Sequence, residues 1–590
     1  MSDYKLDKWD LSELTKDPKG PAFQKQISEV EALAKKFEKI KTNLDPKMQS
    51  KKFMNILHNI EEISEKMSKI GGYASLSYSA DTQSDEATSL MTKVSKIGAD
   101  ISNKILFFDL WWKTKIDEKN AQRLIKDAGE LAEYLNHKRL FAKYALSEPE
   151  EKIINTLEVT GISALVKLYD KMTSAYQYHM KIGNKTKTMT REEITNYIRS
   201  TNEKIRETAY KTILSKYTEN KGVIGEIYQN IVLNWKDEGI EIRGYKSPIS
   251  MRNIANDVDD KTVESLLTVC KKNSPIFQKF FIQKAKMLKM KKLRRFDLYA
   301  PAAAHIKEKT YQYDKSVKIV FESLERFSPQ LAEYAKKVFN EKHVDSLVRP
   351  GKRDGAFCST LSPKITPFVL LNFTGKSRDV FTLAHELGHA VHSQSAKDMS
   401  ILVQDAPLPL AETASTFSEL LLFDNLSEKI TDDERKIMLS EKIDDFYATI
   451  IRQSFFTMFE MDAHEQIGKG TTVDEISKTY LQNLKTQFGN SVILSDDFAI
   501  EWSCIPHFYH TPFYCYAYSF GNLLALSLFQ RYKKEGKDFV PSYIKILSAG
   551  GSRKPEKLLA EHGLDIKSPK FWQEGFDYVE SQVKALAAIN

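Results

Sequence analysis

The stretch Phe381-Thr-Leu-Ala-His385-Glu386-Leu-Gly388-His389-Ala-Val-His392 decides how the rest of this sequence is interpreted. In a helix, His385 and His389 lie one turn apart on the same face, so both imidazoles can bind one metal ion. Glu386 then lies beside the ion, where it can polarise a metal-bound water without being a ligand. With only 12 histidines in 590 residues, this pattern seldom arises by chance. It predicts a metal site that activates water.

A buried structural helix is the alternative interpretation of the same stretch. Three histidines and a glutamate within eight residues are costly to bury without a compensating centre, so we favour the metal site. Gly388 lies in the middle of the predicted helix, where glycine costs about 1 kcal/mol relative to alanine. We therefore expect another element to pack closely against Gly388.

Zinc requires a third protein ligand and an open position for water. His392 is one candidate, but three ligands along one helix edge approach a line, which suits tetrahedral zinc poorly. Glu412 is the better candidate, because a carboxylate in the apolar first turn of a separate helix needs a charge partner. The alternative for Glu412 is a glutamate that stabilises the helix dipole. Ser415 and Glu419 share its face and are suited to orient the imidazoles from behind.

A second segment combines histidines with tyrosines: Ile505-Pro-His507-Phe-Tyr509-His510-Thr-Pro-Phe-Tyr514-Cys-Tyr516-Ala-Tyr518. Such side chains can donate hydrogen bonds to the oxyanion that forms when water attacks a carbonyl group. The alternative is an aromatic core around a helix start. Taken as a group, the segment favours a functional role, and we expect it near the substrate.

The hydrophobic pattern predicts a mainly α-helical fold. Apolar residues recur at spacings of three and four in 21–70, 85–135, 150–182, 190–236, 260–291 and 315–339. The region 349–373 differs, because it predicts two short strands, Gly355–Cys358 and Pro367–Phe373, immediately before the helix that begins at Ser377. We expect an N-terminal helical domain in 1–200 and a catalytic domain in 201–590, with 183–188 as the connector.

Composition excludes several classes of protein. The 87 Lys+Arg against 79 Asp+Glu leave a net charge of +8 that is too diffuse to indicate a nucleic-acid partner. The four cysteines form no CxxC pair and no disulfide framework. No segment approaches the roughly 18 apolar residues that span a bilayer, and the polar start is unlike a signal peptide. We expect a soluble, reduced, cytoplasmic protein.

These residues together resemble oligoendopeptidase F, a family of thimet-oligopeptidase-like zinc metallopeptidases. The resemblance runs along the whole chain and rests on several motifs: Trp9-Asp10-Leu11, Arg243-Gly-Tyr-Lys-Ser-Pro248 with Arg252-Asn253, Gly355-Ala-Phe-Cys358, His385 to His392, Glu412-Thr-Ala-Ser415, Ala549-Gly-Gly-Ser552 and Pro569-Lys-Phe-Trp572. It implies a mainly α, two-lobed zincin with a deep channel and a small β-sheet beside the zinc helix.

The resemblance also implies roles for individual residues. His385, His389 and Glu412 match the ligands of one Zn²⁺ per chain, and Glu386 matches the general base. In the aromatic segment, the closest positions to the family's substrate-contacting residues are His507, Tyr514 and Tyr516. The choice of His507 over His510 stays open, as does the role of His392.

The predicted function is zinc-dependent hydrolysis of internal bonds in short peptides, in which a zinc-bound water attacks the carbonyl and Glu386 is the base. We expect the 367–373 strand to be a sheet edge with which an extended substrate pairs. A zinc carboxypeptidase or dipeptidase is the first alternative, and a non-catalytic peptide-binding protein is the second. Expected partners are short peptides, without nucleic acid or membrane, and the chain is expected to be a monomer or small homo-oligomer.

Overall fold

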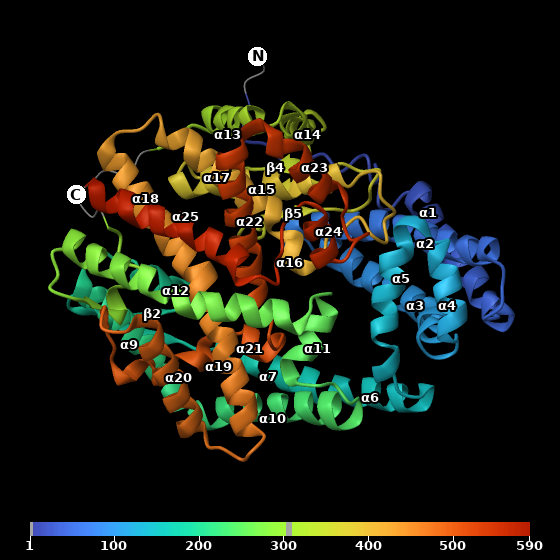
Figure 1. The fold of residues 1–590 in the computed structure, drawn as a ribbon, viewed down its shortest axis with the longest axis horizontal. Coiled ribbons are helices and arrows are strands. Elements are labelled where there is room, and N and C mark those ends of the chain that lie inside the picture. The colour runs from blue at the N-terminus through green and yellow to red at the C-terminus, as the bar shows by residue number, and fades with distance from the viewer. Residues whose placement is uncertain (1–3, 303–309, 590) are drawn as a thin grey trace. The chain divides into compact units, whose positions relative to one another are not determined.

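Two compact units make up the computed structural model, which describes residues 4–302 and 310–589 (Figure 1). The first unit joins Met1–Ala145, Glu308–Lys429 and Leu528–Leu564, and the second joins Leu146–Lys307, Ile430–Ser527 and Asp565–Asn590. Helices dominate both units, as the sequence predicted. Each unit is built from segments far apart in the sequence, and the division into 1–200 and 201–590 stays a prediction.

The N-terminal part of the first unit is a group of packed amphipathic helices. Its members are α1 (Pro21–Glu38), α2 (Ser50–Ala80), α3 (Asp85–Thr114), α4 (Glu118–Lys126) and α5 (Ala132–Leu140). The buried residues of α1 recur every three or four positions, at Phe23, Ile27, Val30, Ala34 and Phe37. They join one continuous core with apolar side chains of the other four helices, which explains the helical periodicity of this region.

The rest of the first unit surrounds a three-stranded sheet. Its helices are α13 (Tyr313–Phe327), α14 (Pro329–Asn340), α15 (Ser377–Ser395), α16 (Leu408–Ala411), α17 (Thr413–Ser427), α23 (Val540–Ser548) and α24 (Pro555–Glu561). The strand order is β4 (Val344–Asp345), β6 (Phe368–Leu370), β5 (Phe357–Ser359). β6 runs parallel to β4 and antiparallel to β5, with Val369 opposite both Val344 and Cys358.

This sheet confirms the two predicted strands and corrects their arrangement. β6 is the middle strand, so its main-chain groups are used by β4 and β5 and it offers no free edge. The expectation that the 367–373 strand is a sheet edge was therefore wrong. In the described part of the chain, β5 is an edge strand of this sheet, and it packs against α15.

The second unit is also helical. It contains α6 (Glu148–Thr160), α7 (Ile162–Ser174), α8 (Arg191–Tyr197), α9 (Glu203–Glu219), α10 (Lys221–Lys236), α11 (Pro248–Ala255), α12 (Asp260–Met287), α18 (Asp432–Phe446), α19 (Arg452–Ile467), α20 (Val473–Phe488), α21 (His507–His510) and α25 (Pro569–Ala588). The division between the units falls within α22 (Tyr516–Glu535). Two short strands, β3 (Leu293–Arg294) and β7 (Val492–Ile493), pair in parallel.

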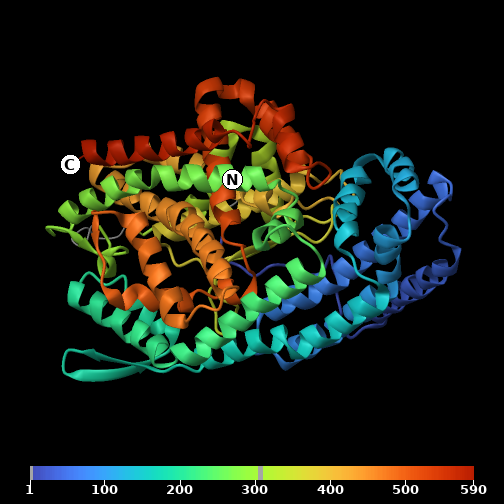
Figure 2. The ribbon, with the colours of Figure 1, turned by 60° about the horizontal axis from the view of Figure 1, so that its bottom comes forward.

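A β-hairpin replaces the predicted connector. β1 (Tyr178–Ile182) and β2 (Lys185–Met189) pair antiparallel around a two-residue turn, and the hairpin projects from its unit in Figure 2. Gly183 has φ of +60°, which suits the first position of such a turn. The 183–188 stretch was therefore wrongly interpreted as a linker, and the helical segment predicted for 150–182 ends at Ser174.

Candidate metal centre and active site

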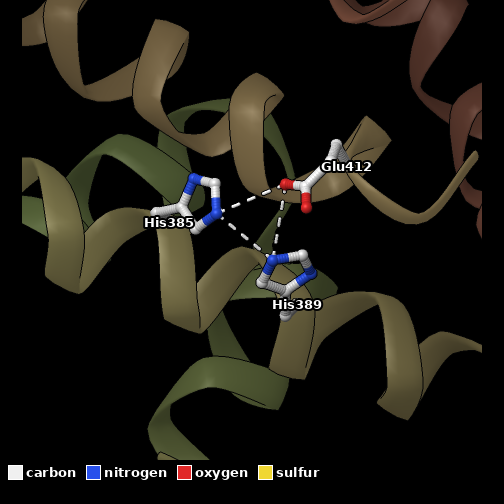
Figure 3. A group of neighbouring side chains, drawn as sticks. All are labelled: His385, His389 and Glu412. Atoms are coloured by element: carbon white, nitrogen blue, oxygen red, sulfur yellow. Dashed lines mark hydrogen bonds and ion pairs between the residues drawn. The ribbon is translucent and has the colours of Figure 1, made fainter. Parts of the chain in front are cut away.

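Three side chains of the first unit converge on one point, as Figure 3 shows. His385 and His389 lie one turn apart on α15, and Glu412 occupies the junction between α16 and α17. The two Nε2 atoms are 3.2 Å apart. Glu412 Oε2 lies 3.3 Å from Nε2 of His385 and 3.5 Å from Nε2 of His389. The structure thus brings together the three residues that the sequence proposed as ligands.

The spacing of these donor atoms fits a single zinc ion. In a tetrahedral zinc site, ligand atoms about 2.0–2.1 Å from the ion lie about 3.3–3.4 Å from one another. The three separations observed here are 3.2, 3.3 and 3.5 Å. Two imidazole nitrogens and one carboxylate oxygen also form a donor set that zinc prefers. The ligand roles of the three residues remain a prediction that this geometry supports.

The pKa values of His385, His389 and Glu412 depend strongly on one another. Burial alone would lower the pKa of His385, but hydrogen bonds to Glu412 and Glu419 outweigh burial and raise it to about 10. The pKa of His389 falls to about 4, mainly because the ring is buried. Burial raises the pKa of Glu412, yet His385, His389 and Ser415 together lower it to about 2. The carboxylate is therefore ionised, and the protonated ring of His385 balances its charge.

A second layer of contacts orients the three side chains. Glu419 Oε1 lies 2.7 Å from His385 Nδ1, which fixes the ring with Nε2 toward Glu412. The ring of His389 hydrogen-bonds the backbone of Ala411. Ser415 Oγ donates to Glu412 Oε2 over 2.7 Å. The sequence pointed to Glu419 and Ser415 as orienting residues, and the structure shows that Ser415 holds the carboxylate rather than an imidazole.

His392 does not join this group. Its side chain is buried and hydrogen-bonds the backbone of Ala411, the residue before Glu412. Burial and the nearby His389 lower its pKa to about 4, so the ring is neutral. The His392 side chain therefore packs between α15 and the α16–α17 junction.

Glu386 is buried beside the same group. It is 6% exposed, and burial, with smaller contributions from Glu412 and Glu419, raises its pKa to about 7. The backbone N–H of Cys358, in the edge strand β5, hydrogen-bonds its carboxylate. A carboxyl group whose pKa lies near 7 can both accept and return a proton at neutral pH. Burial raises the pKa of the Cys358 thiol well above its usual value.

Close contact between α15 and α17 explains the glycine in the middle of α15. A Cβ atom at Gly388 would lie 2.5 Å from Ser415 Cα and 2.6 Å from the carbonyl oxygen of Ala414. These are backbone atoms that cannot rotate away. The expectation of close packing at Gly388 is confirmed, and this contact sets the distance between the histidines of α15 and Glu412.

We expect Gly388→Ala to separate α15 from α17. Overpacking of this kind costs about 1–3 kcal/mol, which exceeds the gain of about 1 kcal/mol from alanine in a helix. The variant should unfold at a lower temperature and bind zinc more weakly than the wild type, measured by calorimetry and by zinc titration. Gly71→Ala in α2 is the control, because a Cβ there meets no atom within 4 Å. Equal stability of the Gly388 variant and the wild type would contradict the packing argument.

The aromatic segment belongs to the second unit. His507 and Tyr514 stack with ring centroids 5.8 Å apart, and Tyr518 lies edge-on to Tyr514 at 5.2 Å. His507 Nε2 is 3.3 Å from the Tyr518 hydroxyl. These three side chains are partly exposed. His510 points elsewhere and pairs with Asp170 over 2.8 Å.

Tyr516 differs from its neighbours, because its side chain is fully buried. Its hydroxyl accepts a hydrogen bond of 2.8 Å from Asn256 Nδ2. The sequence singled out Tyr516 and passed over Tyr518. Tyr514 lies in the turn before α22 and Tyr518 lies in the first turn of that helix, and both rings are partly exposed whereas Tyr516 is buried. Because Tyr514 lies outside the helix, no helical spacing in the sequence points to Tyr518.

A mostly helical fold with His-Glu-x-x-His on one helix and a carboxylate from the start of another defines a metallopeptidase of the zincin class. The chain belongs to peptidase family M3, whose model matches residues 196–578, and the oligopeptidase F model matches residues 114–178. The family expected from the sequence motifs is confirmed. The chain is an oligopeptidase of the metallopeptidase type.

Relatives and solved structures agree with this assignment. The chain is 31% identical to the oligoendopeptidase F homolog of Borreliella burgdorferi over 95% of this chain and 94% of that protein. It is 26% identical to oligopeptidase PepF of Bacillus subtilis, over 97% and 87% of the two chains. A Chlamydophila abortus crystal structure shares the fold with a TM-score of 0.88, at 24% identity and coverage of 99% and 98%. Oligoendopeptidase-F from Enterococcus faecium has a TM-score of 0.71, at 20% identity and coverage of 96% and 98%.

Two further expectations concern the environment of the protein. The cysteines Cys270, Cys358, Cys504 and Cys515 are all free thiols, as predicted. Among the described residues, no helix combines the length and the apolar character needed to cross a membrane.

Proposed function

We propose that this chain is a zinc-dependent endopeptidase that hydrolyses internal bonds of short oligopeptides. The observation that carries the proposal is the set of three donor atoms, two imidazole nitrogens and one carboxylate oxygen, spaced 3.2–3.5 Å apart. His385, His389 and Glu412 would hold one Zn²⁺ per chain. The endopeptidase activity is inferred from the names of the relatives, which include oligoendopeptidase F homologs.

Glu386 carries the proton transfers in this proposal. A zinc ion in this site supplies a Lewis acid that lowers the pKa of water and polarises the scissile carbonyl. Glu386 accepts the proton of the attacking water and returns it to the leaving amine, which its pKa of about 7 favours. Glu419 keeps the His385 ring oriented throughout. His507, Tyr514 and Tyr516 are proposed to assist the oxyanion, with Tyr518 added on the basis of its contacts to His507 and Tyr514.

The edge strand β5 is the proposed docking strand for the substrate. It is an edge of its sheet, and it is bonded directly to Glu386 through the N–H of Cys358. An extended peptide that pairs with main-chain groups is held without regard to its side chains, which favours broad sequence specificity. We also propose that the protein acts in the cytoplasm, without nucleic-acid or membrane partners, as a monomer or small homo-oligomer.

A mixture of peptides of graded length tests the proposal. The mixture is incubated with the enzyme, with and without a chelator and with zinc restored, and the products are identified by mass spectrometry beside an intact folded protein. Internal cleavage of the short peptides, abolished by the chelator and restored by zinc, is the expected result. Release of terminal residues alone would indicate a carboxypeptidase or dipeptidase. Binding of peptides without cleavage in the zinc-loaded protein would indicate a peptide-binding protein.

A further inference from the structure

The turn between α21 and α22 carries Tyr514, and side chains from other helices hold it. Two of its residues, and the first residue of α22, have such contacts. Arg252 Nε donates to the carbonyl oxygen of Pro512 over 3.1 Å, and Glu460 Oε1 accepts from the N–H of Phe513 over 2.9 Å. The third contact is the bond from Asn256 to the Tyr516 hydroxyl. The contacts come from the α11 region and from α19, all within the second unit.

The bond to Glu460 fixes an unfavourable backbone conformation. Phe513 has φ of +58°, in the left-handed region that bulky side chains rarely adopt. In that conformation its N–H points into the interior, where it meets the carboxyl group of Glu460. Its ring packs beside His464, with centroids 4.5 Å apart. Without an acceptor at Glu460, the buried N–H would be unsatisfied and the turn would be free to relax.

Glu460 has no other evident use in the structure. It is fully buried, and among the described residues its second oxygen, Oε2, has no hydrogen-bond partner. An acidic side chain in the core is costly, so a role for Glu460 beyond packing is indicated. Burial raises the pKa of Glu460 to about 8, although the Phe513 N–H and Arg252 oppose this shift. The side chain is therefore mostly a neutral acid near pH 7, and glutamine is its close mimic.

We propose that Glu460 is a positioning residue for Tyr514. By holding the Phe513 N–H, it fixes the turn in the conformation that stacks Tyr514 on His507 and against Tyr518. The hydrogen bond of Glu460 is to the backbone of Phe513 and not to a proposed reacting group, so Glu460 acts through the backbone of the turn. This inference rests on the proposed function, because it assigns Tyr514 to the oxyanion of the peptide substrate.

The test compares two replacements of Glu460 in the zinc-loaded, full-length protein. Glu460→Gln keeps an acceptor for the Phe513 N–H, and Glu460→Met removes it at similar volume. Thr457→Val is the matched control, because Thr457 is also buried on α19 and its hydroxyl donates within that helix, to the carbonyl of Gln453. We expect Glu460→Met to lower kcat about tenfold to hundredfold with KM little changed. Glu460→Gln should retain most of the activity, and Thr457→Val all of it.

Two further readouts separate positioning from general destabilisation. In a Tyr514→Phe background, Glu460→Met should cause less than a twofold additional loss, because both changes remove the same interaction. Zinc content should stay at one per chain in every variant. Losses that multiply in the double variant, equal impairment by Gln and Met, or a folded Met variant with unchanged kcat would each overturn the proposal.

Hydrogen exchange of the Phe513 amide tests the hydrogen bond between this amide and Glu460 without relying on activity. In the wild-type protein this amide should exchange as slowly as the amides of α19, although it lies in a turn. Fast exchange would overturn the proposal. This measurement does not depend on whether Glu460→Met folds. If the zinc-loaded protein cleaves no peptide at all, the proposed function fails. Slow exchange of the Phe513 amide that is lost in Glu460→Met and kept in Glu460→Gln would still establish that Glu460 holds the turn.

Discussion

Replacing Glu386 with glutamine is expected to lower kcat for peptide hydrolysis about 10²–10⁴-fold, the usual contribution of a general base. The amide has the same shape as the carboxyl group but cannot accept the proton of the attacking water. Because Glu386 is not among the three converging donor atoms, zinc should remain at one per chain. Steady-state kinetics on a short peptide and metal analysis of the same preparation measure both quantities.

The control for this variant is Glu428→Gln. Glu428 follows α17 in the same unit, is exposed, and pairs with Arg326 at the surface, so its replacement makes the same charge change away from the site. It should leave kcat and zinc content at wild-type values. A zinc-replete Glu386→Gln enzyme with turnover near that of the wild type would refute Glu386 as the base.

Replacing Glu412 with alanine is expected to remove zinc from the protein. Of the three converging donors, two imidazoles on one helix then remain, and the half-buried site loses the negative charge that would balance the cation. After dialysis against zinc-free buffer, we expect less than one tenth of the wild-type zinc content and no chelator-sensitive hydrolysis. Atomic emission spectroscopy measures the metal directly.

Variants of Glu419 and His392 show whether the loss of zinc is specific to Glu412. Glu419→Gln alters a partner of His385 rather than a ligand, so zinc affinity should fall only about 10–100-fold. His392→Ala should leave zinc bound, because the His392 ring contacts the Ala411 backbone and not the donor atoms. If zinc survives in Glu412→Ala and is lost in His392→Ala, the proposed ligand set is wrong.

Sequence patterns were sufficient to predict the features that depend on residues close together in the chain. The spacing of His385 and His389 places both rings on one helix face, and α15 confirms that face. Glu412 could be chosen because a carboxylate among apolar neighbours requires a partner. Gly388 predicted a close contact from its cost in a helix, although the sequence does not identify the contacting residues as Ala414 and Ser415.

Other features required the tertiary structure. The order of strands in a sheet depends on which segments pair, so the sequence of 355–373 predicts two strands but cannot place β6 in the middle. The hairpin of β1 and β2 was missed although Gly183-Asn184 is a turn signal. Glu460 lies on a helix distant in sequence from Phe513, and no spacing rule connects them. The sequence could not correct the preference for Tyr516 over Tyr518, because only the tertiary structure shows that Tyr516 is the buried one of the two.

The proposed docking strand β5 is short, so few backbone groups of a peptide could pair with it. Main-chain groups of successive strand residues point to opposite sides, and β5 spans only Phe357–Ser359, with the N–H of Cys358 already bonded to Glu386. The carbonyl of Cys358 is then the acceptor that β5 can offer a substrate on that side. N-methylation of one peptide residue next to the cleaved bond should therefore block hydrolysis, whereas N-methyl groups farther along the peptide should be tolerated.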